Sequence, residues 1–481
     1  MTFLAQRHTK IGAREALTGL AAIILWSAAS TPVLSQEAED DGPGPLTELN
    51  VDELTLSGTA NEAASSTQPF RVGSIGAVDQ GTSTDNGDPY AAEGLRLGSF
   101  VVRPTLEVGI TGTRSVTNRD SGGPAGFVED QTISFNSENS LGLLINSDWS
   151  RHFLELDLSG TLPVGISGDE DDPSLDARAN LNLDLSALTS ISLTGVYGYS
   201  TEDPQSAAYR AAIDAGAPSL RGINEPATQL YSGTVTVNHD FGGLTAQISA
   251  AIARLEYGAA KLSDGTSVSQ ADLNSTDYNI SFRGGYALSG VLSPFVELRY
   301  GKRLTDELLD SGGFNRNATN YQLRLGTEID FAEKLSGEIG VGYGVEKYDD
   351  ASLPDVSGVV ADLEFNWSPQ RGTDVTLSAS TEFVPSGTED VSGSLLYATE
   401  LGLSHRLTSQ LTGTAAFGVA YEAFEGPSAN ETTLNGSLGM IYNLNRYLAL
   451  TSRIGHEQTF SSSESARESS SNIFVGMRLQ R

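Results

Sequence analysis

The feature that most constrains the fold of this chain is an alternation of apolar and polar side chains whose polar side has nothing to cover it. In residues 293–303 (SPFVELRYGKR), the apolar residues Val296, Leu298 and Tyr300 are separated by charged ones. Side chains point alternately to the two faces of a β-strand. One face of this segment therefore needs an apolar neighbour, and the other needs water or opposite charges.

The same alternation continues through about 18 segments from Leu95 onward, each as long as the roughly 9 to 11 residues that a tilted membrane strand needs. The polar side of almost every segment consists of Ser, Thr, Asn, Gly, Asp, Glu or Arg, and no second apolar set or helix is present to cover it. The alternative is a soluble two-layer β-fold, which would bury the apolar faces against each other. The uncovered polar faces favour instead a barrel whose apolar side chains face lipid and whose polar ones face a wet interior.

The connections between these segments alternate strictly between short and long. Short links lie near Ser150, Leu188, Gly242, Gly290, Glu333, Gln370, Thr408 and Asn445, and long ones span residues 114–130, 167–174, 201–226, 258–274, 304–318, 347–356, 385–390, 424–430 and 457–470. Transmembrane barrels show this pattern because their periplasmic turns are short and their outer loops long. The sequence therefore predicts an all-β fold: an antiparallel up-and-down transmembrane barrel of the outer-membrane type with about 18 strands, within a range of about 16 to 18.

The chain divides into three predicted regions. Residues 1–35 read as a signal peptide, because basic residues precede the apolar run 17–29 (LTGLAAIILWSAA). An N-terminal membrane anchor is the alternative, but this run is shorter than the roughly 20 apolar residues of a spanning helix. Residues 36–93 are acidic and rich in Gly, Ser, Thr and Pro, which predicts a disordered periplasmic tail, and residues 94–481 form the barrel. We expect the cell outer membrane as location, with both termini periplasmic.

Charge and cysteine content exclude several classes of partner and site. The net charge is −32, whereas binding to nucleic acid needs a basic surface, so a nucleic-acid partner is excluded. The chain has no cysteine, which excludes disulfides, thiolate metal sites and a cysteine nucleophile. The fold must be held by hydrogen bonds and packing.

The polar face of the segments carries the candidate functional residues. The predicted pore-lining positions are Arg103, Glu107, Arg283, Glu297, Arg299, Arg303, Arg324, Glu328, Glu338, Arg453 and Arg478. Arginines concentrate on three consecutive central segments and, across the closure, on the last two and the first, whereas the five segments after the central three contribute mainly acids. Opposed charges across a wet interior would select solutes by charge. The same residues could instead form ion pairs that rigidify the wall, and the sequence leaves this choice open.

Catalysis and metal binding have little support in the sequence. His152, His239 and His405 lie at predicted periplasmic turns, where amphipathic rings commonly sit at an interface. His456 and Glu457 suggest a hydrolase dyad, but a nucleophile motif such as G-x-S-x-G is absent. The acidic stretches 169–172 and 349–350 do not have the ligand spacing of a defined calcium loop. We therefore expect no enzyme, no cofactor and no metal.

The stretch GLRLGSFVVRPTLEVGIT, residues 94–111, preceded by Asp88, Pro89 and Tyr90, resembles the putative β-barrel porin 2 family of Gram-negative outer-membrane proteins. The resemblance implies a porin-like barrel over about residues 90 to 481, sometimes linked to surface polysaccharide, and it assigns no functional residues. We expect passive diffusion of small hydrophilic solutes. The alternative is a non-conducting barrel that anchors or assists surface polysaccharide or envelope assembly. Expected partners are outer-membrane lipid, the outer-membrane assembly machinery and the solutes, and a homo-oligomer is left open.

Overall fold

The computed structural model describes residues 90–120, 127–167, 173–201, 226–262, 264–331, 334–386, 391–425, 430–461 and 468–481. The predicted signal peptide and nearly all of the predicted tail lie outside these residues, as does the acidic stretch 169–172. The described part of the chain contains no helix long and apolar enough to cross a membrane.

The wall of the molecule consists of long antiparallel strands. They are β2 (Phe100–Asp120), β3 (Phe127–Ser147), β4 (His152–Ser167), β5 (Ser174–Ser186), β6 (Thr189–Thr201), β7 (Ala227–Asp240), β8 (Leu244–Tyr257), β11 (Ser275–Tyr286), β12 (Leu292–Thr305), β13 (Ala318–Asp330), β14 (Leu335–Tyr348), β15 (Val356–Gln370), β16 (Thr373–Pro385), β17 (Gly393–Arg406), β18 (Leu411–Glu425), β19 (Glu431–Asn445), β20 (Leu448–Ser461) and β21 (Glu468–Gln480). The short strands are β1 (Leu95–Leu97), which pairs with β2, and β9 (Ala260–Lys261) and β10 (Ser267–Val268), which pair with each other. A short helix, η2 (Ala271–Leu273), follows β10.

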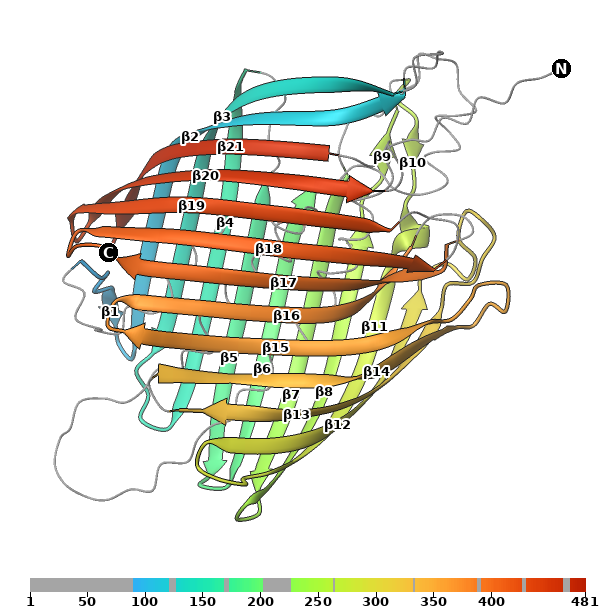
Figure 1. Cartoon of the computed structure of the whole chain (residues 1–481), viewed down its shortest axis with the longest axis horizontal. Coiled ribbons are helices and arrows are strands. Elements are labelled where there is room, and N and C mark those ends of the chain that lie inside the picture. Colours follow the sequence, from blue (N-terminus) through green and yellow to red (C-terminus); the bar gives the residue numbers. More distant parts are fainter. Residues whose placement is uncertain are drawn as a thin grey trace.

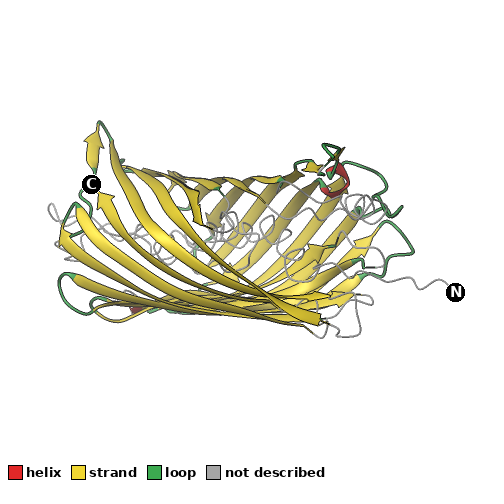
Figure 2. Ribbon diagram, turned by 90° about the horizontal axis from the view of Figure 1, so that it is seen from above, coloured by secondary structure: helices red, strands yellow, loops and turns green. Residues whose placement is uncertain are grey.

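The long strands close into a barrel. Each pairs with its neighbours along the chain, and β21 pairs with β2 from Thr105↔Gln480 to Thr117↔Glu468, which completes a ring of 18 strands. Figure 1 shows the two walls of this ring with opposite strand slants, and Figure 2 shows the strands wrapping around a common interior. The predicted fold class and strand number are therefore confirmed.

Short and long connections lie at opposite ends of the barrel, as predicted. All eight predicted short links join strands at one end, where β2 begins and β21 ends. The chain entering the barrel is held there: Gln480 donates a hydrogen bond to the carbonyl of Tyr90 (2.9 Å), and Arg446 pairs with Glu93. We call this end the turn end and the opposite end the loop end.

Two predicted long links are shorter in the structure. The ladder between β2 and β3 continues to Asp120↔Phe127, so most of residues 114–130 is strand, and β20 and β21 likewise extend into the predicted link 457–470. The sequence of these extensions, such as residues 114–120 (RSVTNRD) and 457–461 (EQTFS), is mostly polar and lacks the regular apolar alternation of the other strands. Beyond a membrane both faces of a strand can meet water, so backbone pairing continues while the apolar alternation that reveals a strand disappears.

The outer surface of the barrel is apolar. On β12, Leu298 is 53% exposed, whereas its neighbour Glu297 on the interior face is 3% exposed. Two rings of exposed aromatic residues bound the apolar surface: Tyr231, Tyr278, Tyr300, Tyr321, Tyr343, Tyr421 and Phe460 toward the loop end, and Trp149, Phe241, Tyr286, Phe331, Trp367, Tyr442 and Tyr447 toward the turn end. Aromatic girdles at both interfaces are the mark of a membrane-spanning barrel. We call the first set the outer aromatic ring.

If the outer surface faces lipid, the cost of placing a charge on it should depend on how deep in the membrane the residue lies. Leu298 and Leu304 lie on the same face of β12, Leu298 in the middle of the apolar surface and Leu304 near the loop end. We expect Leu298→Arg to lower the free energy of unfolding in lipid vesicles by about 2–4 kcal/mol, and Leu304→Arg by about 1 kcal/mol or less. Urea titration of the refolded barrels measures both. Equal losses at the two positions would contradict a lipid-facing surface.

Candidate functional site

The candidate site is the charged interior face of the barrel. Strand register and burial place every predicted pore-lining residue on this face: Arg103 and Glu107 on β2, Arg283 on β11, Glu297, Arg299 and Arg303 on β12, Arg324 and Glu328 on β13, Glu338 on β14, Arg453 on β20 and Arg478 on β21. The structure gathers them, with acids that the sequence did not single out, into three clusters.

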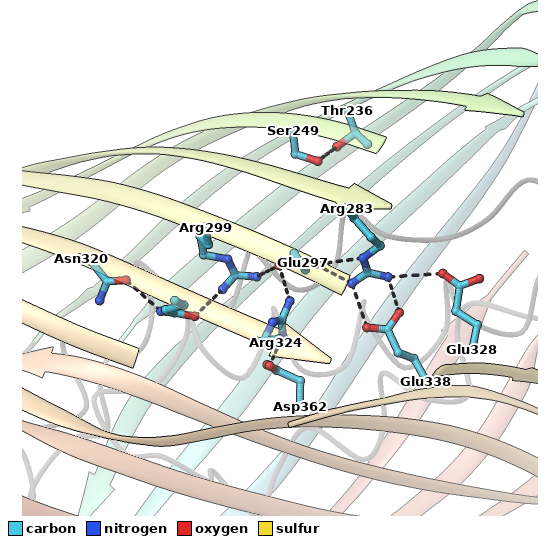
Figure 3. A network of polar contacts seen from close by, with 11 residues as sticks. Thr236, Ser249, Arg283, Glu297, Arg299, Asn320, Arg324, Glu328, Glu338 and Asp362 are labelled. Atoms are coloured by element: carbon cyan, nitrogen blue, oxygen red, sulfur yellow. Dashed lines mark hydrogen bonds and ion pairs between the residues drawn. The ribbon is translucent and has the colours of Figure 1, made fainter. Parts of the chain in front are cut away.

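The first cluster surrounds Glu297 (Figure 3). Its carboxylate accepts hydrogen bonds from Arg283 (2.9 Å), Arg299 (3.1 Å) and Arg324 (2.6 Å), which come from three adjacent strands. The side chain of Glu297 is 4% exposed. A carboxylate so enclosed is stabilised because three guanidinium groups replace the water that it has lost.

The arginines of this cluster have further acidic partners. Arg283 binds both carboxylate oxygens of Glu338 (2.6 and 2.9 Å) and reaches Glu328 at 3.3 Å, while Arg324 pairs with Asp362 on β15. The cluster therefore ties five neighbouring strands, β11 to β15, along the interior. Four carboxylates face three arginines, so the cluster as a whole is not a positive patch.

The second cluster lies nearer the loop end. Arg303 binds Asp277 on β11 (3.1 Å) and Glu346 on β14 (2.9 Å), and the hydroxyl of Tyr348 donates to Glu346 (3.1 Å). Asp277, Glu346 and Tyr348 were not among the predicted residues. Their alternation with apolar neighbours put them on the interior face, but only the cross-strand register shows that they meet Arg303.

The third cluster joins the first two long strands of the barrel, β2 and β3, to the last two, β20 and β21. Glu107 on β2 accepts hydrogen bonds from Arg453 on β20 (2.8 Å) and Arg478 on β21 (3.1 Å), and Arg453 also binds Glu138 on β3 (2.8 Å). Arg103 lies apart, where it donates to the carbonyl of Ala92 (3.3 Å) at the entrance of the chain. The arginines near the two ends of the sequence thus belong to the closure of the ring.

Two clusters share one packing arrangement. The guanidinium of Arg283 lies 4.0 Å from the ring centre of Phe295, and that of Arg453 lies 4.0 Å from the ring centre of Phe474. Each ring covers a glycine of a neighbouring strand: a Cβ atom at Gly326 would collide with Phe295, and one at Gly109 would collide with Phe474. Each aromatic ring therefore lies between a wall glycine and a guanidinium group, and its cation–π contact stabilises the arginine in addition to the ion pairs.

The part of the wall between the first and third clusters is acidic. The interior positions of β15 to β19 include Asp362, Glu364, Glu382, Glu400, Glu422 and Glu431. Between Val356 and Asn445 the only basic residues of the sequence other than the histidine are Arg371 and Arg406, both at the turn end. The arginines of the three clusters thus form ion pairs with interior carboxylates, whereas the interior positions of β16 to β19 carry acidic residues and no arginine away from the turn end.

The histidines and Glu457, which the sequence analysis considered as catalytic residues, do not form a catalytic arrangement with one another. His456 and Glu457 lie on opposite faces of β20, so they form no dyad, and His456 pairs with Ser471 (2.9 Å). His239 and His405 contact Thr189 (2.8 Å) and Thr373 (2.7 Å) on the neighbouring strand beside the short turns. Within the described residues, no group of His, Cys, Asp and Glu side chains could hold a metal ion.

Comparisons with known proteins agree with a barrel. Residues 88–481 match the family described as putative beta-barrel porin 2. No curated protein matches the chain. Among solved structures, the chain is similar to the outer membrane protein opdK from Pseudomonas aeruginosa, with 13% identity, a TM-score of 0.36, and coverage of 79% of this chain and 99% of that one.

Two further solved structures are similar at the same level. A BenF-like porin from Pseudomonas fluorescens Pf-5 shows 10% identity and a TM-score of 0.38, over 79% of this chain and 99% of that one. The FrpB iron transporter from Neisseria meningitidis shows 9% identity and a TM-score of 0.37 over 74% of this chain, which spans 62% of the transporter's length. At such scores the fold rests on the strand pairing of this chain itself.

The central position of Glu297 makes a prediction about stability. Glu297→Gln removes the charge that three buried guanidinium groups share, and we expect it to lower the free energy of unfolding by about 3 kcal/mol. Glu328→Gln is the matched control, because that side chain is 27% exposed and lies at the edge of the same cluster. For it we expect a loss of about 1 kcal/mol or less. Similar losses in urea titrations would show that Glu297 is not the centre of the cluster.

Proposed function

Since the chain belongs to the putative beta-barrel porin 2 family, its role is porin-like, and we propose that it is an outer-membrane channel for the passive diffusion of small hydrophilic solutes. The observation that carries the proposal is the division of the barrel into an apolar outer face and an interior face that is polar throughout most of its area and carries clusters of charged side chains on β11 to β15 and on β20, β21, β2 and β3. A charged interior is expected where solutes pass in water, whereas a purely structural barrel could fill its interior with apolar packing.

The proposed orientation follows from the two ends of the barrel. The turn end faces the periplasm and the loop end faces outside, so both termini are periplasmic. Residues 1–35 then serve as the signal peptide for export, and the outer-membrane assembly machinery inserts the barrel. The channel needs no cofactor and performs no catalysis.

The interior charges support a preference for cations. The arginines of the clusters are compensated by neighbouring carboxylates, whereas β16 to β19 contribute interior acids and no arginine near the middle of the wall. A negative wall concentrates cations and repels anions of similar size.

Planar bilayers test the channel directly. We expect refolded residues 36–481 to give steady conductance that rises with salt, and a reversal potential in a salt gradient that shows cation preference. Gel mobility that shifts on heating would confirm that the protein is folded. Silence from folded protein would overturn the channel and favour the alternative barrel that anchors or assists envelope assembly.

The acidic sector gives a prediction of its own. Glu364 and Glu400 flank Ser378 on the interior face of three adjacent strands. We expect the double variant Glu364→Gln, Glu400→Gln to lower the ratio of cation to anion permeability by about twofold or more. Glu256→Gln is the control, because Glu256 pairs with Arg254 on the outer face. An unchanged reversal potential in the double variant would show that solutes do not pass along this wall.

A further inference from the structure

The outer parts of β16 and β17 do not lie in the lipid-facing wall. A wall strand exposes every second side chain, yet Thr381, Glu382, Phe383 and Val384 are all buried, as are the four residues Gly393–Leu396. The alternation of Val375, Leu377 and Phe383 predicts that Phe383 faces lipid, and at 2% exposure this interpretation is wrong. We call residues 380–385 and 391–397 the inner hairpin end.

The inner hairpin end packs on the interior surface of its neighbours. The ring of Phe383 lies over Gly344 of β14 together with Val360 of β15. Leu395 and the hydroxyl of Tyr397 lie over Gly358 of β15. All three contacted residues are on the interior face, so the inner hairpin end is folded inside the barrel.

The backbone ladder between β15 and β16 ends at Ala379, immediately before the inner hairpin end begins. It runs from Gln370↔Thr373 to Leu363↔Ala379 and does not extend into residues 356–362, although both strands continue. Every other described ladder between neighbouring long strands runs to within one or two residues of the loop end of at least one of the two strands. In place of the ladder, the hydroxyl of Thr381 contacts both the amide (3.0 Å) and the carbonyl (3.2 Å) of Ala361.

The same residues fit a second arrangement. Continued in register, the ladder would place Val359 opposite Phe383 and Val360 opposite Glu382. Phe383 and Leu395 would then face lipid beside the outer aromatic ring, as Tyr421 does on β18, and Glu382 would face the interior. Because the sequence pattern of a wall strand is intact, pairing with β15 is a second arrangement that these residues fit, besides the folded-in position that the structure shows.

Contacts at the tip hold the folded-in position. Arg316, from the loop between β12 and β13, donates to the carbonyl of Val391 at 2.8 Å and is itself oriented by an ion pair with Asp310. These are side-chain contacts, which yield more easily than a backbone ladder.

We propose that the inner hairpin end is a gate that narrows the interior when it is folded in and opens it when it pairs with β15. The inference rests on the proposed function, since a gate controls a path for solutes. In the folded-in position, apolar side chains and Glu382 lie inside the barrel at the level of Thr381. Thr381 pairs with Tyr397, which in turn neighbours Tyr421 of the outer aromatic ring. The loop end of the barrel is then the side where passage is controlled.

Two disulfides distinguish the positions, and the chain offers a background without cysteine. A Cβ atom at Gly358 would lie 4.0 Å from Cγ of Leu395, so Gly358→Cys with Leu395→Cys can cross-link only the folded-in position. Val359→Cys with Phe383→Cys would be opposite each other only in the paired position. We expect oxidation to lower the mean conductance of the first variant and raise that of the second by about twofold or more, each reversed by reductant.

The tip contact provides an independent variant. Arg316→Ala removes the hydrogen bond to Val391, and we expect a higher mean conductance than in the matched control Arg254→Ala, which breaks another loop-end ion pair, with Asp306 (2.5 Å). Heat-shifted gel mobility of each variant verifies folding. Failure of the second cysteine pair to cross-link, or conductance unchanged by both disulfides and by Arg316→Ala, would overturn the gate alone. A folded wild-type protein without conductance would instead overturn the proposed channel.

Discussion

The structure depends on one constraint: in hydrocarbon every backbone amide and carbonyl of the wall needs a partner within the wall. The pairing of β21 with β2 meets this demand by removing both free edges of the sheet. Once the ring is closed, register decides everything else about the interior, because a shift by one residue would turn Glu297 toward lipid and Leu298 inward. The interior charges are therefore positioned by backbone pairing before any of them meets a partner.

The clusters show how such an interior tolerates buried charge. Arginine and carboxylate side chains from adjacent strands meet at hydrogen-bonding distance, and Phe295 and Phe474 fill the space that glycines of the neighbouring strands leave. Burying such a charge costs desolvation free energy, and this cost is offset when several oppositely charged groups bind it at once, as three guanidinium groups do at Glu297. One cluster strengthens the sector from β11 to β15 and another the seam where the chain closes on itself. Between them, β16 to β19 carry no arginine except Arg406 at the turn end, and this asymmetry in charge is the basis of the proposed cation preference.

The seam between β15 and β16 departs from the same constraint. Over residues 356–362 the ladder is replaced by one hydroxyl and by apolar packing of Phe383 and Leu395 on glycines of the interior face. The inner hairpin end can either bury its apolar side chains inside the barrel or pair its backbone with β15 in the wall, but it cannot do both at once. The proposed gate requires two arrangements at one place, and the interrupted ladder between β15 and β16 is where a second one could form.

The sequence by itself determined the class of fold, a strand number of about 18 and the face on which the predicted interior residues lie, because period-two alternation and the order of short and long links are local properties of the chain. It could not determine the length of β2 and β3, whose outer segments lack regular apolar alternation, nor the partners of Arg303 and Arg453, which come from other strands and are set by the cross-strand register. It also assigned Phe383 to lipid, and its alternation does fit a wall strand. Only the tertiary structure turned that residue inward, because whether β16 pairs with β15 or packs on the inside of β14 depends on contacts such as Arg316 with Val391, which no local pattern contains.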